Sequence, residues 1–188
     1  MANIIISLHI TLDGFVAGPN GEMDWINLAD EMFDYVGHLT DNADTALYGR
    51  KTFEMMDAYW PTAADKPNAS NHDKQHSSWY NKVNKYVLSN TMKGKYGDKI
   101  KFINDDLETK LKFIKEQSTN NILVFGSPSA IHFLFSKKLV DEIYLFVNPV
   151  LLGEGIPLFK DVEERQILKL ISCKTFDSCN VVCLHYSK

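Results

Sequence analysis

The stretch ALYGRKTFEMM, residues 46–56, decides how the fold of this chain is interpreted. An apolar, strand-like run ends at Gly49, two cations follow at Arg50 and Lys51, and a helix-like segment begins at once. A fold needs a turn there, but it does not need two positive charges at the mouth of that turn. A helix N-terminus carries free N–H groups and a partial positive charge, so this turn is suited to an anion.

Two further strand-to-helix turns have the same character. YVLSNT (86–91) ends a strand in hydroxyl and amide side chains, and VFGSPS (124–129) ends another in a glycine and two serines. In an open α/β sheet, ligands bind beyond the carboxyl ends of the strands, where such turns meet. The helix N-termini after Gly49 and Gly126 suit the two halves of a pyrophosphate, because glycine lets a phosphate approach the backbone.

A third phosphate would fit further out on the same edge. Ser89 and Thr91 offer hydroxyl groups there, and Lys93 and Lys95 follow closely in the sequence. An additional phosphate at that distance distinguishes NADPH from NADH, so the predicted cofactor is NADPH. The predicted cofactor-binding residues are Gly49, Arg50, Thr52, Leu88, Ser89, Asn90, Thr91, Gly126, Ser127 and Ser129.

Each turn also has a simpler interpretation. Ser127 and Thr52 are residues that commonly cap helices, and Arg50 and Lys51 are typical of a solvated surface. The sequence contains neither the Walker A pattern nor GxGxxG. The coincidence of three polar turns on one sheet edge is what favours a ligand site.

Strand and helix patterns alternate along most of the chain. This order predicts an α/β fold with a mainly parallel sheet covered on both faces and a C-terminal antiparallel hairpin. The length suits one domain, residues 1–188, in which the polar segment 61–79 forms an excursion with a helical second half. Strands are expected at 3–12, 45–49, 85–90, 99–104, 121–126, 141–153, 166–176 and 180–187, and helices at 26–40, 51–59, 106–117 and 127–139.

Composition excludes several classes of partner. The net charge of -4 gives no basic field for nucleic acid, and the apolar runs are too short or too interrupted to span a bilayer. The N-terminus has no signal-peptide pattern, so a cytoplasmic location is expected. Cys173, Cys179 and Cys183 are an odd set without partners for a metal site, and we interpret them as reduced thiols. No metal is predicted.

The residues at the turns resemble the dihydrofolate reductase superfamily. LYGRKTFE (47–54) is similar to its Gly-Arg-x-Thr-aromatic-Glu segment, YVLSNT (86–91) to the strand that ends at its 2′-phosphate, and VFGSPSAIHFLF (124–135) to its Gly-Gly turn. SLHITLDGFVAGPNGEMDW (7–25) and LVDEIYLFVNPVLLGEGIPLF (139–159) resemble the reductase domain of the bifunctional deaminase–reductase of riboflavin biosynthesis, and its stand-alone relatives.

This resemblance runs from about residue 3 to the final hairpin. It implies a three-layer α/β/α dihydrofolate reductase-like fold, bound NADPH and a homodimer. The deaminase domain of the bifunctional enzyme is absent from the sequence. Ser127 stands where the family has the second glycine of its pair, which leaves open whether the Gly126–Ser127 peptide is cis.

Two carboxylates are candidates for proton transfer. Asp13 leaves the first strand on the same edge as the three turns, and its alternative role is that of a turn residue. Asp30 lies five residues after Trp25, a spacing similar to that of the Trp and the pterin-binding carboxylate on the first helix of dihydrofolate reductases. A carboxylate in an apolar pocket would have a raised pKa and could pass a proton, whereas a surface helix position would leave Asp30 without that role.

Aromatic side chains and one glycine are candidates for substrate binding. Trp25 and Phe33 offer an aromatic wall for a planar ring, and Trp60 before a proline offers a stack or a lid anchor. Each of the three is equally suited to core packing. Gly153 lies in a turn that could approach the nicotinamide, or that only reverses the chain. His72 and His76 have i, i+4 metal-ligand spacing, but in a polar segment without a third ligand they are expected to face solvent.

These observations predict an NADPH-dependent reductase that transfers a hydride to a C=N or C=O carbon of a small heterocycle. The activity that the resemblance implies is reduction of 5-amino-6-(5-phosphoribosylamino)uracil, and reduction of a pterin such as dihydrofolate is the alternative. A nucleotide-binding module without turnover is an alternative of another class. Self-association is expected because the late strands IYLFV (143–147) and NVVCLHY (180–186) are apolar on both faces.

Overall fold

The computed structural model describes residues 2–92, 96–160, 162 and 164–188, so the predicted phosphate ligands Lys93 and Lys95 lie outside the described residues. The strands are β1 (Ile4–Thr11), β2 (Phe15–Ala17), β3 (Ala43–Gly49), β4 (Asn84–Leu88), β5 (Ile100–Ile103), β6 (Asn121–Phe125), β7 (Glu142–Asn148), β8 (Ile156–Pro157), β9 (Lys169–Phe176) and β10 (Val181–Ser187). The helices are α1 (Asp30–Asp41), α2 (Arg50–Tyr59), the 3-10 helix η1 (Trp60–Asp65), α3 (Asn71–Lys82), α4 (Leu107–Gln117) and α5 (Pro128–Ser136).

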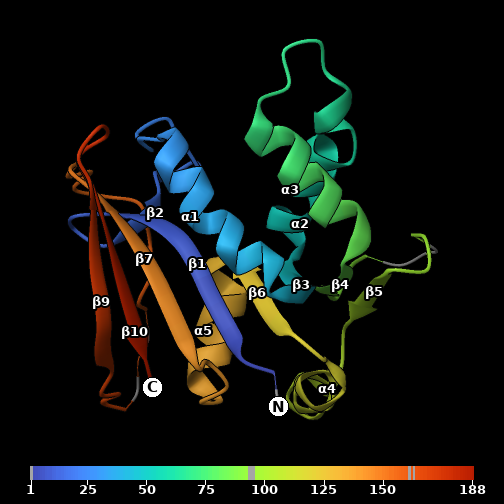
Figure 1. Cartoon of the computed structure of the whole chain (residues 1–188). Helices are drawn as coiled ribbons and strands as arrows, with labels where there is room; N and C mark the ends of the chain where they lie inside the picture. Colours follow the sequence, from blue (N-terminus) through green and yellow to red (C-terminus); the bar gives the residue numbers. More distant parts are fainter. Residues whose placement is uncertain (1, 93–95, 161, 163) are drawn as a thin grey trace.

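The main sheet has eight strands in the order β5-β4-β3-β6-β1-β7-β10-β9. All pairs from β5 to β7 are parallel, and β10 runs antiparallel to both β7 and β9. Helices α1, α2 and α3 cover one face and α4 and α5 the other (Figure 1). The predicted α/β fold with a mainly parallel sheet and a C-terminal antiparallel hairpin is therefore confirmed.

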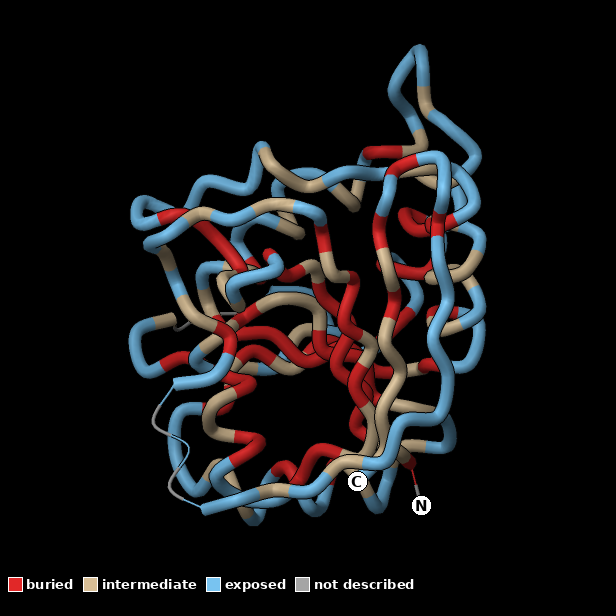
Figure 2. The backbone as a smooth tube through the Cα atoms, turned by 90° about the vertical axis from the view of Figure 1, so that its left-hand side faces the viewer, coloured by how far each residue is buried: buried red, intermediate tan, exposed pale blue. Residues whose placement is uncertain are grey.

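The alternation of side chains along β1 divides the core between the two faces. Ile4, Ile6, Leu8 and Ile10 pack with α4 and α5, whereas Ile5 joins the cluster under α2 and α3. Buried backbone is concentrated in these central strands (Figure 2). A strand buried on both faces needs apolar residues at nearly every position, which is why IIISLHIT contains so few polar ones.

Two predicted boundaries need correction. Residues 26–29, expected in the first helix, precede α1, which begins only at Asp30. The segment 61–79 is more regular than an excursion, because η1 and α3 occupy most of it. A reciprocal capping box begins α3: the Ser70 hydroxyl accepts from the Asp73 N–H at 3.0 Å, and the Asp73 carboxylate accepts from the Ser70 N–H at 2.9 Å.

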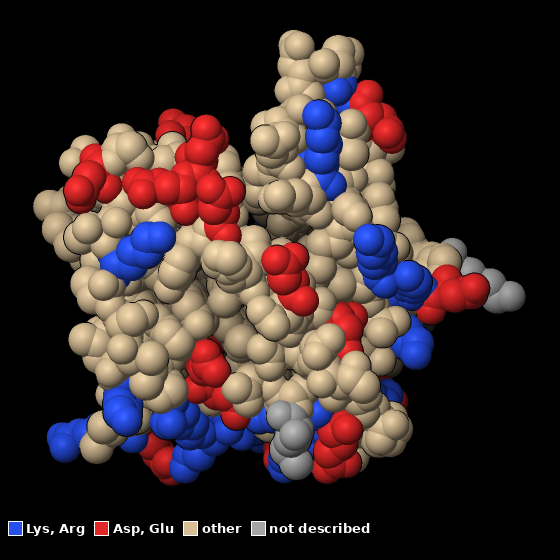
Figure 3. Space-filling view, viewed as in Figure 1, with Lys and Arg blue, Asp and Glu red and all other residues tan. Residues whose placement is uncertain are grey.

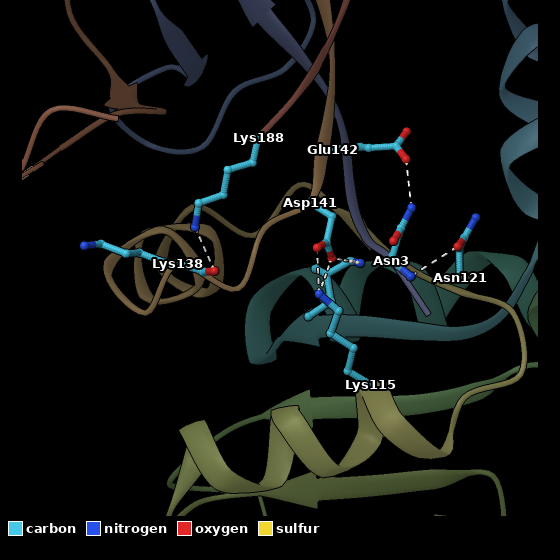
Figure 4. A network of polar contacts seen from close by, with 8 residues as sticks. Asn3, Lys115, Asn121, Lys138, Asp141, Glu142 and Lys188 are labelled. Atoms are coloured by element: carbon cyan, nitrogen blue, oxygen red, sulfur yellow. Dashed lines mark hydrogen bonds and ion pairs between the residues drawn. The ribbon is translucent and has the colours of Figure 1, made fainter. Parts of the chain in front are cut away.

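The amino ends of the central strands are joined by a polar network (Figure 4). The Asp141 carboxylate accepts from the Ile4 N–H at 2.7 Å and from the Lys115 ammonium at 2.7 Å. The Asn3 side chain donates to Glu142 at 2.9 Å. These contacts fix the start of β1 beside β7. The carboxyl ends of the parallel strands, where ligands bind in open α/β sheets, lie at the opposite end of these strands.

The strands named for self-association do not lie at the sheet edge. β7 lies between β1 and β10, and β10 lies between β7 and β9. The edge strand on this side of the sheet is β9, which is exposed at every residue except Phe176 and appears pale blue along nearly its whole length (Figure 2).

Candidate functional site

A cleft of about 470 Å³ opens where β3, β4 and β6 end. Its walls come from the three turns that the sequence singled out, with Ile156 of β8 added. All the predicted cofactor residues line it except Gly126, which lies directly between Phe125 and Ser127. The lining residues are Gly49, Arg50, Lys51, Thr52, Leu88, Ser89, Asn90, Thr91, Ser127, Pro128, Ser129 and Ile156.

The first and third turns are held together by one hydrogen bond. The Gly49 N–H donates to the Ser127 Oγ at 2.6 Å, and both residues are buried. A Cβ at Gly49 would lie 2.3 Å from that oxygen, so the close approach requires glycine. Gly126 and Ser127 have φ values of 56° and 65°, and no peptide bond among the residues described is cis.

This hydrogen bond corrects the capping interpretation of Ser127. The residue occupies the N-cap position of α5, but its side chain makes no capping hydrogen bond to the helix. The helix begins at Pro128, whose missing N–H is no loss at this position. The free N–H groups that follow are not satisfied by the Ser127 side chain and remain suited to an anion.

The second turn is shaped by the buried Ser89 hydroxyl. Its Oγ accepts from the Met92 N–H at 3.0 Å and from the Thr91 N–H at 3.3 Å. Such serine-centred turns are a local alternative to helix or strand hydrogen bonding. The hydroxyl thus fixes the backbone on which Asn90 and Thr91 reach the cleft.

Arg50 supplies movable positive charge at the mouth of the cleft. Its Nη1 contacts both carboxylate oxygens of Glu54 at 3.0 Å, one helical turn along α2. Both side chains are more than two-fifths exposed, and exposed pairs of this kind are weak. The guanidinium can therefore exchange Glu54 for a phosphate, for which its two-pronged geometry is well suited.

A second pocket, of about 160 Å³, lies between α1, α3 and the sheet. The two pockets share elements, because Phe125 immediately precedes the Gly126 turn and Met56 lies one helical turn after Thr52 on α2. Its lining residues are Ser7, Leu8, His9, Leu28, Met32, Phe33, Val36, Met56, Trp60, His72, His76, Phe125 and Phe146.

Aromatic rings form much of this second pocket. Phe33 stacks on His72 with ring centroids 4.0 Å apart, and Trp60 lies 4.0 Å from the His76 ring. Phe33, predicted with Trp25 to form an aromatic wall, and Trp60, predicted as a stack or lid anchor, both line this pocket, whereas Trp25 does not. Whether they contact a substrate stays a prediction.

The histidines of the second pocket depart from their predicted position. His76 is only 6% exposed and His72 is half-buried, so the expectation that they face solvent is wrong. Burial lowers the pKa of His76 from 6.5 to about 3 and that of His9 to about 4. His9 Nδ1 accepts from the Asn148 side chain at 3.2 Å, whereas His76 Nε2 has no hydrogen-bond partner among the described residues.

The Asp13 carboxylate holds the loop that follows β7. It accepts from the Thr11 hydroxyl at 2.6 Å and from the N–H groups of Gly153 and Leu152 at 2.8 and 3.0 Å. These hydrogen bonds, first that from Thr11, lower the pKa of Asp13 although it is exposed. The geometry favours the turn interpretation of Asp13 and Gly153, and neither lines either pocket.

Asp30 is the first residue of α1, so the structure favours the alternative that Asp30 is a surface helix aspartate. Asp30 is exposed, and the Trp25 indole N–H donates to the Glu22 carbonyl at 3.2 Å. Neither lines either pocket, so their catalytic and substrate roles stay predictions.

Sequence reasoning missed the contribution of β1 to the second pocket. Ser7 and His9 project to the face of the sheet opposite Leu8 and Ile10, as strand alternation requires. Two polar side chains on one face of an otherwise apolar strand were a signal that could have located them. No cluster of metal-ligating side chains occurs within the part of the chain that the structure covers.

Comparison with known proteins identifies the family. A model of the RibD C-terminal domain matches residues 2–184, nearly the whole chain. The chain belongs to the RibD C-terminal domain family. This RibD C-terminal domain is 36% identical over 179 residues to "Uncharacterized protein YyaP" of Bacillus subtilis, covering 93% of this chain and 89% of that protein.

Solved structures support the same fold. A putative riboflavin biosynthesis protein from Shewanella sp. PV-4 matches with a TM-score of 0.74 at 24% identity, covering 100% of this chain and 98% of that one. The diaminohydroxyphosphoribosylaminopyrimidine deaminase/5-amino-6-(5-phosphoribosylamino)uracil reductase of Thermotoga maritima matches with a TM-score of 0.70 at 16% identity, over 99% of this chain and 56% of that one. These neighbours share the fold of this RibD C-terminal domain. No helix in the described part of this RibD C-terminal domain is long and apolar enough to cross a membrane.

The buried histidines make stability depend on pH. The unfolded chain takes up protons on His9 and His76 near pH 6.5, whereas the folded chain keeps both neutral until about pH 4 and 3. The unfolded state therefore binds more protons in this interval, and the free energy of unfolding falls as pH drops below 6.5. The free energy of unfolding falls by at most about 1.4 kcal/mol per pH unit for each histidine. His76→Phe should remove the His76 contribution to the pH dependence of the free energy of unfolding, measured by urea unfolding at a series of pH values.

The matched control is His38→Phe, because His38 is exposed on α1 outside the pocket. The free energy of unfolding of this control should fall with decreasing pH as steeply as that of the wild type. An equally steep fall in His76→Phe and His38→Phe would show that His76 is not held neutral by burial.

Proposed function

We propose that this RibD C-terminal domain is a cytoplasmic NADPH-dependent reductase of the riboflavin-biosynthesis type that acts on a small heterocycle. The observation that carries the proposal is the cleft at the ends of β3, β4 and β6, which shares α2 with a ring-lined pocket. The free cysteines agree with a reducing compartment. When bound, NADPH would supply the hydride for the reduction.

The residues of the cleft fit a dinucleotide with three phosphates. The starts of α2 and α5, with the free N–H groups of helix N-termini, border a cleft in which Gly49 leaves no side chain between the two turns. Arg50 adds a charge that is released from Glu54 at little cost. Ser89, Asn90 and Thr91 present polar groups on the outer wall, where the additional phosphate of NADPH is expected.

The second pocket would hold the acceptor ring. Phe33, His72 and Trp60 provide flat walls, and the surrounding apolar side chains exclude water from the reacting faces. Asp13 and Asp30, the carboxylates that the sequence predicted for proton transfer, both lie outside the described lining, and the lowered pKa of Asp13 makes it a poor proton donor. An aminouracil ribotide, as named for the Thermotoga relative, and a pterin are the two substrate types to compare.

Arg50→Ala tests the cofactor assignment directly. Loss of a hydrogen bond to a charged group is expected to weaken NADPH binding by about 1.5–3 kcal/mol, or roughly tenfold to 150-fold in Kd. The Kd is measured by titrating NADPH against protein fluorescence. Arg165→Ala is the matched control, because Arg165 is the only other arginine, is exposed and is not part of the cleft.

An unchanged Kd in Arg50→Ala would contradict the assignment. Binding without consumption of NADPH by any heterocycle tested would favour the alternative of a nucleotide-binding module.

We also propose that the protein is a homodimer that pairs through β9. This edge strand exposes Leu170 and Ile171, each about half accessible, and nothing within the described chain covers it. A strand edge is self-complementary about a twofold axis, so a second copy is the fitting partner. Ile171→Lys should shift the sedimentation coefficient toward the monomer, while Phe113→Lys on α4 should not, although Phe113 is also exposed. A wild-type monomer at all concentrations would reject the proposal.

A further inference from the structure

His9 lines the second pocket with one ring nitrogen that has no partner. The residue follows Ser7 by two positions on β1, so both side chains leave the same face of the sheet and reach this pocket. No hydrogen-bond partner of His9 Nε2 occurs among the described residues, and this atom, unlike His76 Nε2, is not sealed inside the protein. The surface is hollowed between the α1 side of the molecule and α3, the two helices that border the pocket (Figure 3). His9 Nε2 is therefore placed to meet a ligand.

The other ring nitrogen of His9, Nδ1, is held by Asn148. The Asn148 side chain is fully buried, and its oxygen accepts from the Asn27 backbone N–H at 2.9 Å. A backbone N–H only donates, so this contact identifies which end of the amide is the oxygen. The amide nitrogen donates to the Phe146 carbonyl at 3.0 Å and lies 3.2 Å from His9 Nδ1. Because an amide NH₂ group has no acceptor capacity, Nδ1 must accept and carries no proton.

The proton of a neutral His9 is therefore on Nε2. Burial lowers the pKa of His9 to about 4, so the ring is neutral near pH 7. Within the described residues, the lining of the pocket includes no lysine, arginine, aspartate or glutamate that would change this state. A neutral imidazole has one donor and one acceptor, and the acceptor is already occupied by Asn148. The nitrogen that faces the pocket is thus a hydrogen-bond donor.

The donor is also fixed in its orientation. The His9 ring stacks on Phe146 with the ring centroids 5.1 Å apart and 25° between the planes. Asn27, whose N–H orients Asn148, is itself tied by its side chain to the Cys179 carbonyl at 3.3 Å. A chain of contacts thus runs from the loop before α1 through Asn148 to the pocket. A donor that is oriented before the ligand arrives loses little conformational freedom on binding.

We propose that His9 is a neutral hydrogen-bond donor in the second pocket, that Asn148 is the positioning residue that keeps its proton on Nε2, and that this N–H binds an acceptor atom of the ligand. The acceptor is a carbonyl oxygen or an unprotonated ring nitrogen. A ligand without such an atom at this position would leave the donor unsatisfied. The inference rests on the proposed function only for the identity of this ligand as the substrate that is reduced.

The first test determines the tautomer of His9 in the wild-type protein. Nitrogen–hydrogen correlation spectra of the imidazole rings at neutral pH distinguish a protonated from an unprotonated ring nitrogen, and a spectrum of His9→Gln assigns the His9 signals. His9 should show a protonated Nε2 and an unprotonated Nδ1. A proton on Nδ1, or a doubly protonated ring, would overturn the inference.

Asn148→Asp tests the positioning role with a side chain of the same shape. A carboxylate accepts where the amide donates, so His9 should take a proton on Nδ1, and its pKa should rise above the wild-type value of about 4. The pKa is measured by NMR titration, after circular dichroism has checked that the variant is folded. An unchanged pKa of His9 in the folded variant would contradict the role of Asn148, and the wild-type spectrum decides the tautomer if the variant does not fold.

Pyridine and benzene test the donor toward a ligand. Both rings have the same shape and are small enough for a pocket of about 160 Å³, but only pyridine has an acceptor nitrogen. Each is titrated against the whole chain by NMR in mildly alkaline buffer, where pyridine is neutral. His9→Phe keeps a ring without a donor, so it should weaken pyridine binding roughly twofold to tenfold and should not weaken benzene binding. His9→Gln restores an N–H donor and should recover part of the pyridine affinity, whereas His38→Phe, an exposed control, should bind as the wild type does.

Two results of the probe titrations would overturn the inference. One is the absence of pyridine binding to the wild type, and the other is a folded His9→Phe that loses affinity for both probes equally or for neither. The NADPH titration decides the proposed function separately. A protein that binds NADPH but fails the pyridine comparison keeps the reductase proposal and loses this one. A protein that passes the pyridine comparison but does not bind NADPH keeps the His9 donor and loses the reductase.

Discussion

The hydrogen bond from the Gly49 N–H to the Ser127 Oγ is the contact on which the ligand edge of this protein depends. It joins two turns that lie 78 residues apart in the sequence, at a point where only glycine leaves enough room. The Ser127 hydroxyl oxygen accepts this hydrogen bond from Gly49, and its side chain makes no capping hydrogen bond to α5. As a result, the N-termini of α2 and α5 border one cleft, and the free backbone N–H groups of a helix N-terminus are suited to an anion.

Helix α2 connects the two parts of the site and separates their chemistry. Its first residues, Arg50 to Thr52, line the charged cleft, and Met56 one turn later lines the neutral pocket. The end of β6 makes the same transition, from Phe125 in the pocket to Ser127 in the cleft. A ligand that spans both therefore needs an anionic part on one side and an uncharged ring on the other.

The parts of the site that follow from local sequence were predictable. Gly49, Ser89 and Ser127 each end a recognisable strand, and strand ends in a parallel sheet meet on one edge whatever the details of packing. The burial of His76 was not predictable from its polar neighbours, because it depends on α3 folding back over Phe125 and Trp60. The first helix was also predicted to begin too early, at residue 26, whereas α1 begins at Asp30.

The most direct test of a shared nucleotide site is an amide NMR titration of the protein with NADP⁺. The signals of Gly49, Ser89 and Ser127, one from each turn, should shift together along a single binding curve, because one ligand would contact all three turns. Shifts confined to one turn, or three turns that follow different curves, would contradict the claim that these strand ends form a single nucleotide site.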